Sequence, residues 1–274
     1  MSLELTEIWR YPVKSCRGEQ LTEAAVEPWG LAGDRRWMIV DGAGDAVTAR
    51  DYPPLVLVTP RVEDGKITLS GPGLPEVTVP VPSGADLVPV SVWGYDLLAS
   101  PADGVASLWL TGIVGVPVRL VYLDDPTRRS PNPAYSQDGD LVSLADGYPL
   151  LLTNEASLDA VNGWIAAGPM PAEGPIPMRR FRPNVVLAGA PAWAEDNWRR
   201  LRIGPVTFRV AKGCDRCVFT TIDPDTAKRG HEPLFALARH RRWDGKIWFG
   251  VNLIPDATGA DAVIRAGDPV EILE

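Results

Sequence analysis

Short apolar runs separated by turns are the main pattern along this 274-residue chain. RWMIV is followed by DGAGDA and VTAR, and the stretches RVEDGKITLSG and PVSVWGYDLLAS repeat the order of apolar segment, glycine-containing turn and second apolar segment. Asp-Gly and Gly tolerate the positive φ angles of tight turns, so each stretch predicts a β-hairpin. The pattern therefore predicts a mainly β protein of the α+β class.

Three segments show helical spacing instead. TNEASLDAVNGWIAAG places Leu158, Val161 and Ile165 on one face, after Asn154 as a candidate N-cap. EPLFALARHRRW carries Pro233, which suits a first helical turn, and GVASLWLTGIVG is a third helical candidate. The polar, proline-containing stretch from 123 to 140 predicts a long loop, either a crossover between domains or a flap over a site.

Composition narrows the class of protein. A net charge of -8 argues against a general binder of nucleic acid or of anionic membranes, because both partners need a basic surface. The chain shows neither a secretory leader nor eighteen uninterrupted apolar residues, so we expect a cytoplasmic protein without membrane or nucleic-acid partners. Its length favours two domains.

The cysteines admit three kinds of chemistry. Cys214 and Cys217 form a Cys-x-x-Cys pair, and Cys16 is the third and last cysteine. Structural zinc needs four ligands, and only Cys16, His231 and His240 could complete such a set. A redox dithiol belongs between a strand and a helix, whereas VFTTI, which follows Cys217, predicts another strand. The third possibility is a single thiolate bound to a soft transition metal.

Basic, hydroxyl and amide side chains follow several predicted strands. YPVKSCRG contains Lys14 and Ser15, GDRRW contains Arg35, and RRFRPN contains Arg182 and Asn184. Such groups suit an anionic cofactor, for example a phosphate ester, because Arg offers forked hydrogen bonds and Lys a point charge. Each of them is also compatible with an ordinary solvated surface charge.

Taken together in this order, YPVKSCRG, GLAGDRRWMIVD, PLLLTNEASLDAVN, FRPNVVL, AEDNW and CDRCVFTTIDPDT resemble the MOSC family, named for the C-terminal domain of molybdenum-cofactor sulfurases. The chain is most similar to the two-part branch that includes the amidoxime-reducing components. This resemblance implies an N-terminal MOSC-associated β-barrel domain over residues 1–122. It further implies a MOSC β-barrel domain with peripheral helices over residues 123–274.

The resemblance also implies a molybdenum cofactor, a pterin dithiolene with a phosphate. Cys217 matches the catalytic cysteine that binds the molybdenum, while Cys214 and Cys16 are expected to pack. The motif positions expected to contact the cofactor are Lys14, Ser15, Arg35, Asn154, Ser157, Arg182, Asn184, Asp215, Arg216, Thr220 and Thr221. Asn154 and Ser157 are helix-cap candidates as well, so their role stays open here.

For function, the resemblance implies an oxidoreductase that reduces a small N-hydroxylated or N-oxide substrate. No ferredoxin-like module follows DPVEILE, so we expect electrons from a separate flavin, haem or iron–sulfur protein. The alternatives are a cofactor carrier or sulfur-transfer module without reductase turnover, and a zinc or dithiol protein. The chain departs from the family pattern at one position, because Ala227 follows DPDT where family members often have Gly. The substrate range of the family is therefore not carried over to this chain.

Overall fold

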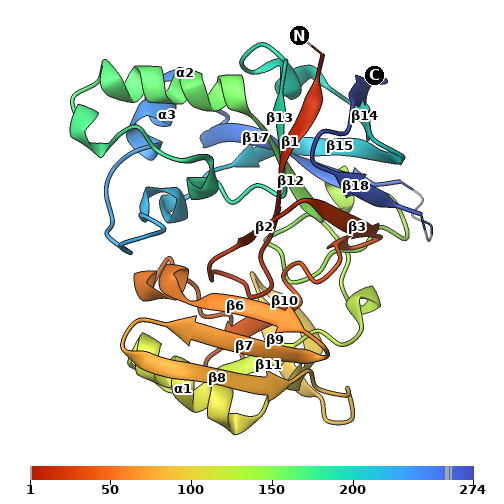
Figure 1. The fold of residues 1–274 in the computed structure, drawn as a ribbon, viewed down its shortest axis with the longest axis vertical. Coiled ribbons are helices and arrows are strands. Elements are labelled where there is room, and N and C mark those ends of the chain that lie inside the picture. The colour runs from red at the N-terminus through yellow and green to blue at the C-terminus, as the bar shows by residue number, and fades with distance from the viewer. Residues whose placement is uncertain (1, 257–258, 260) are drawn as a thin grey trace.

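The computed structural model describes residues 2–256, 259 and 261–274, and strands dominate it (Figure 1). Within these residues there are three α-helices, α1 (Gly104–Val114), α2 (Glu155–Ala166) and α3 (Leu234–His240). The three predicted helices are confirmed, as is the mainly β class. None of the described helices is both long enough and apolar enough to cross a membrane.

A nine-stranded, curled sheet forms the upper body in Figure 1. Its path runs β19-β14-β15-β17-β12-β13-β1-β2, and β16 pairs with β17 off this path. The strands are β1 (Glu4–Arg10), β2 (Glu19–Leu21), β12 (Leu150–Asn154), β13 (Val185–Ala188), β14 (Arg200–Ile203), β15 (Val206–Asp215), β16 (Arg242–Trp243), β17 (Lys246–Pro255) and β19 (Val270–Ile272). β12 and β13 are parallel, and α2 lies between them in the chain, as a parallel connection requires.

Three smaller sheets complete the fold. β5 (Trp37–Val40), β11 (Arg119–Tyr122), β10 (Tyr95–Pro101) and β9 (Val88–Val92) form one of them in this order. β6 (Thr59–Glu63), β7 (Lys66–Gly71) and β8 (Leu74–Pro80) form the second, which lies with α1 in the lower body of Figure 1. The third contains β18 (Val263–Arg265), β3 (Glu23–Glu27) and β4 (Gly30–Leu31).

Most of the predicted hairpins are present. β6–β7 and β9–β10 are confirmed, with the turns at Asp64-Gly65 and at Trp93-Gly94 in left-handed backbone. In the first stretch only a bridge follows the turn, between Val40 and Ala46. The strand expected at VFTTI is wrong, because Val218–Thr221 form a 3-10 helix, η7.

The two bodies share parts of the chain. β1 pairs with β13, so the first strand belongs to the sheet that later residues build. Leu5 and Ile8 of β1 are fully buried there together with Leu152 and Val185. In return, Ile222 packs into the core of the lower body. The division of domains at 122/123 stays a prediction, and residues from both halves meet where the bodies join.

Candidate functional site

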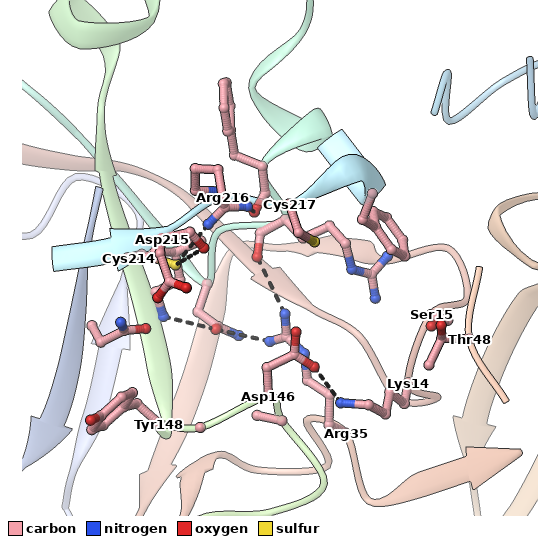
Figure 2. A pocket seen from close by; sticks show the side chains of 18 of the residues that line it. Lys14, Ser15, Arg35, Thr48, Asp146, Tyr148, Cys214, Asp215, Arg216 and Cys217 are labelled. Carbon is pink, nitrogen blue, oxygen red and sulfur yellow. Dashed lines mark hydrogen bonds and ion pairs between the residues drawn. The ribbon is translucent and has the colours of Figure 1, made fainter. Parts of the chain in front are cut away.

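A cavity of about 490 Å³ lies where the two parts of the chain meet, and Figure 2 shows its lining at close range. This volume is in the range of small-molecule and cofactor sites. The N-terminal part contributes Lys14, Ser15, Arg35, Thr48, Arg50 and Trp93; the later part contributes residues of 145–151, 181–184 and 214–219, and Asn252. Eight of the sequence-predicted residues line it: Lys14, Ser15, Arg35, Arg182, Asn184, Asp215, Arg216 and Cys217.

The cavity is basic although the chain is acidic. Its lining contains five cationic side chains against two carboxylates, namely Lys14, Arg35, Arg50, Arg182 and Arg216 against Asp146 and Asp215. A concave wall with an excess of one charge focuses the field and concentrates ligands of the opposite charge. The cavity therefore favours an anionic ligand.

Four of the lining residues adopt left-handed backbone without being glycine. The φ angles are 69° at Ser15, 45° at Arg35, 55° at Trp93 and 56° at Arg182. This region is uncommon for side-chain-bearing residues, and strain of this kind concentrates at functional sites. Here it fixes the direction in which hydroxyl, guanidinium and indole groups enter the cavity.

Arg35 and Arg182 are neighbours on the cavity wall. Arg35 donates to Asp34 at 2.6 Å, to the Asn184 Oδ1 atom at 2.9 Å and to the Arg182 carbonyl oxygen at 3.2 Å. Arg182 donates through Nη1 to the Cys16 carbonyl oxygen at 2.6 Å and stacks 4.1 Å from the centroid of the Tyr11 ring. Burial, and next the charge of Arg35, lower the pKa of Arg182 to about 10. In the described part of the chain no acceptor faces the other N–H groups of Arg182, so they can serve a ligand.

Asn184 lines the cavity and is also hydrogen-bonded to the protein on both sides of its amide group. Its Oδ1 atom accepts from Arg35 and, at 3.1 Å, from the Leu151 amide, while its Nδ2 atom donates to the Trp9 carbonyl oxygen at 3.1 Å. The side chain is 1% exposed. Asn184 thus joins β1 to β12 and positions Arg35, and its contacts are with protein groups.

Asp146 links the two halves of the cavity, and sequence reasoning missed it. Its carboxylate accepts from Lys14, from Arg50 at 2.9 Å and from the Trp93 indole at 3.1 Å. Burial lowers the pKa of Lys14 to about 8. Partial desolvation inside the cavity would raise the pKa of Asp146, but the charges of Lys14 and Arg50 hold it below its usual range. Arg50 and Trp93 lie in stretches that predicted only β-hairpins, and Asp146 lies in no quoted stretch, so only the folded chain brings the three together.

Both thiols of the Cys-x-x-Cys pair reach the cavity. Cys214 lies in β15, and Cys217 immediately precedes η7. Arg216 donates through Nη1 to the Cys214 sulfur at 2.9 Å and through Nη2 to the Phe181 carbonyl oxygen at 2.6 Å. Burial raises the pKa of Cys214. The Arg216 Nε atom is buried without a hydrogen-bond partner in the described structure, so a polar group remains available beside Cys217.

Among the described residues, no set of zinc ligands surrounds these thiols. No cluster of three or more His, Cys, Asp or Glu residues with the arrangement of a metal site occurs within the described residues. His231 contacts Glu173 at 3.2 Å, and His240 stacks on Trp164 with ring centroids 4.2 Å apart. Cys16 is fully buried, and burial raises the pKa of its thiol to about 12.

Four of the predicted contact residues do not line the cavity. Thr220 and Thr221 are buried in η7, where their hydroxyls donate to the carbonyl oxygens of Cys217 and Val218. Asn154 caps α2 by accepting from the Ala156 amide. Its amide and the Ser157 hydroxyl donate to the buried carboxylate of Glu195, so the two residues, at the end of β12 and in α2, make hydrogen bonds within the protein.

Ala227, which follows DPDT where family members often have Gly, does not line the cavity and packs against the core of the lower body. Its φ angle is 57°, a left-handed backbone that Gly adopts at a lower cost than Ala. The Ala227 amide donates to the Asp223 carbonyl oxygen at 2.9 Å, which closes the DPDT turn. The turn therefore keeps the conformation that glycine would favour.

Two protein-family models match this chain. Residues 2–117 match the MOSC N-terminal beta barrel domain, and residues 140–271 match the MOSC domain. The chain belongs to the MOSC family, in the branch that carries both domains.

Curated relatives extend over nearly the whole chain. It is 32% identical over 288 residues to mitochondrial amidoxime-reducing component 1 of Mus musculus, covering 98% of this chain and 82% of the relative. It is 32% identical to mitochondrial amidoxime reducing component 2 of Rattus norvegicus, with 97% and 82% covered. The solved structure of the YUAD protein from Bacillus subtilis aligns over 98% of this chain and 94% of that one, at 11% identity and a TM-score of 0.44.

Proposed function

We propose that this protein is a molybdenum-cofactor-dependent reductase of N-hydroxylated compounds. The observation that carries the proposal is one cavity whose lining contains Cys217 together with Lys14, Arg35 and Arg182. The relatives named amidoxime-reducing components support the reaction class. The reaction converts an N–OH group into N–H and water with two electrons and two protons.

The residues of the cavity fit such a cofactor. A phosphate needs several charge-assisted donors, and Arg182 has N–H groups without an acceptor in the described structure, next to Lys14, Ser15 and Arg35. A thiolate is a suitable ligand for a soft metal, and Cys217 provides a thiol at the same cavity. When bound, the molybdenum centre would supply the two-electron chemistry that amino-acid side chains lack.

The chain itself would hold and orient the reactants. Arg35 is fixed by Asp34 and Asn184, so its charge is in place before a ligand arrives, and such preorganisation lowers the cost of binding. The hydroxyls of Thr220 and Thr221 donate to the carbonyl oxygens of Cys217 and Val218, and these bonds stabilise the turn that follows Cys217. Burial, followed by the nearby Tyr135 and Asp215, raises the pKa of Tyr148 to about 12, so this phenol keeps its proton at neutral pH and can donate a hydrogen bond.

The test is turnover of benzamidoxime by protein produced with molybdenum, with reduced methyl viologen as the electron donor. We expect benzamidine as the product, no turnover for Cys217→Ala and retained turnover for Cys214→Ala. A separate redox protein would replace the viologen in the cell.

Two results would contradict the proposal. Equal turnover of wild type and Cys217→Ala at equal molybdenum content would reject the ligand assignment. Transfer of intact cofactor to an acceptor apoprotein, without turnover of any N-hydroxylated compound, would identify a carrier instead.

A further inference from the structure

Two aromatic rings lie against the arginines of the cavity wall. The guanidinium carbon of Arg182 is 4.1 Å from the centroid of the Tyr11 ring and 5.1 Å from that of the Phe219 ring. The guanidinium carbon of Arg35 is 4.3 Å from the same Tyr11 centroid. All three distances are within the range of cation–π contacts. The proposed function assigns no role to either ring.

The Tyr11 ring contacts two like charges. Asp34 is paired with Arg35, and among the described residues no carboxylate is paired with Arg182. The face of an aromatic ring is electron-rich, so it attracts a cation without neutralising it. A carboxylate in the same place would pair with Arg182 and compete with an anionic ligand. The ring therefore stabilises both guanidinium groups and leaves their charges available to a ligand.

Tyr11 is itself held in place. Its amide donates to the Asp34 Oδ1 atom at 2.8 Å, and its carbonyl oxygen accepts from the Arg35 amide at 2.7 Å. A Cβ atom at Gly18 would lie 2.4 Å from the Cε1 atom of Tyr11, so only glycine lets the chain pass this close to the ring. The buried Tyr11 hydroxyl has no hydrogen-bond partner in the described structure. The ring face, and not the hydroxyl, is thus the group that acts on the arginines.

Phe219 connects Arg182 to the segment of Cys217. It lies in η7, Val218–Thr221, which begins immediately after Cys217, and it lines the cavity. Among the described residues, the Arg182 guanidinium group makes one hydrogen bond, from Nη1 to the Cys16 carbonyl oxygen. A planar group held by one bond can rotate about it, whereas contact with two rings fixes its plane. Arg182 thus enters the cavity in one orientation.

We propose that Tyr11 and Phe219 are positioning residues, which hold the guanidinium groups of Arg35 and Arg182 ready for one shared phosphate group. Such preorganisation lowers the cost of binding, because the anion does not have to bring two like charges together. This inference rests on the proposed function, which supplies the phosphate of the cofactor. It goes further by assigning part of the phosphate affinity to two side chains that carry no charge.

Phosphate binding to protein produced in a host without the molybdenum cofactor tests the inference. The probe is inorganic phosphate, and the Kd follows from the rise in Tm relative to sodium chloride at equal ionic strength. Arg182→Met reports the general effect of phosphate salts on stability, which is subtracted. Tyr11→Phe should keep the wild-type Kd, because it keeps the ring.

Ring fluorination then separates the charge distribution of the ring from its shape. Phenylalanines with one, two and three ring fluorines at position 11 keep the shape of the ring while weakening its negative face. We expect the Kd for phosphate to rise stepwise, by about tenfold in total for three fluorines. Phe219→Leu should raise the Kd about threefold, because its ring lies farther from Arg182.

Tyr122 provides the matched control. The guanidinium carbon of Arg36 lies 5.1 Å from the centroid of the Tyr122 ring, and neither residue lines the cavity. The same fluorinated phenylalanines at position 122 should leave the Kd for phosphate unchanged.

The outcomes separate this inference from the proposed function. Wild type that reduces benzamidoxime but shows no phosphate effect beyond that of Arg182→Met would overturn the inference alone. A Kd that does not change with fluorination at position 11 would mean that the ring acts only by its shape, and this would also overturn it. Equal increases from fluorination at positions 11 and 122 would assign the effect to the whole fold, with the same consequence. Absence of turnover, with the stepwise rise in Kd, would reject the proposed reaction and keep Tyr11 as a positioning residue of a phosphate site.

Discussion

Several residues of the cavity wall have a left-handed backbone conformation, which residues other than glycine rarely adopt. Ser15, Arg35 and Arg182 each lie in a predicted motif, and each adopts left-handed backbone at the cavity wall. The motifs were enough to select these residues as candidates, and the structure places all three on the cavity wall. The φ angles and the positioning of Arg35 by Asn184 depend on contacts between segments far apart in the chain, which no local pattern encodes.

At the residue scale, the lowered pKa of Lys14 predicts how stability depends on pH. Its folded pKa is about 8 and the unfolded value is 10.5, so between these values the unfolded chain binds the proton and the folded protein releases it. Lys14 therefore contributes a rise in stability with pH across this window, by about 1 kcal/mol per pH unit, while the raised pKa values of the Cys16 and Cys214 thiols contribute a fall in the same range. Urea unfolding of the ligand-free protein between pH 8 and 10 should give wild type a slope about 1 kcal/mol per pH unit more positive than that of Lys14→Met. Equal slopes in the two proteins would contradict the burial of a charged Lys14.

Helix α2 shows how one element settles an ambiguous motif. The sequence left Asn154 and Ser157 open between capping and cofactor contact. The structure uses Asn154 as the N-cap, and the hydroxyl of Ser157 donates to Glu195 at 2.7 Å and accepts from the Trp193 amide at 2.8 Å. The helix itself was predictable from its apolar spacing and cap, but Glu195 is distant in sequence and gave no signal.

Ser157→Ala should therefore be a stability variant. It leaves the Trp193 amide unpaired and removes one donor from the buried Glu195, which should lower the free energy of unfolding by about 1–3 kcal/mol. Urea denaturation measures this loss, and elemental analysis should find the wild-type molybdenum content per folded molecule. A large loss of molybdenum without a loss of stability would return Ser157 to the cofactor site.

The segment after Cys217 shows where propensity fails. VFTTI is rich in β-branched residues, which favour strands. Thr220 and Thr221 instead donate to carbonyl oxygens three residues earlier, and Ile222 is buried in the core of the lower body. Local side-chain bonds and long-range packing override the strand preference, as hydroxyl side chains often do in turns.

At the scale of the whole molecule, the site exists because the two halves of the chain meet. Lys14, Arg50 and Trp93 come from the first half. Their side chains all donate hydrogen bonds to the carboxylate of Asp146, which comes from the second half. The mainly β class and the family resemblance were available from the sequence. The placement of β1 was not, because only its pairing with β13, far away in the chain, assigns it to the upper sheet.

Asp146→Asn tests this junction. The change leaves the buried Lys14 ammonium without its counter-charge, which is costly for a buried pair. Because the Asp146 side chain is 63% exposed, we expect a smaller loss of about 1–3 kcal/mol in the free energy of unfolding at pH 7. Asp244→Asn, at an exposed turn with φ of 52°, is the matched control and should change stability little. Equal effects of the two variants would mean that Asp146 does not hold the halves together.

The most direct measurement is the molybdenum and pterin content of protein produced in a molybdenum-replete host, for wild type, Cys217→Ala and Cys214→Ala. The account predicts molybdenum near one atom per chain in wild type and in Cys214→Ala, and loss of the metal in Cys217→Ala. Zinc in place of molybdenum, or neither metal nor pterin in wild type after reconstitution, would contradict it.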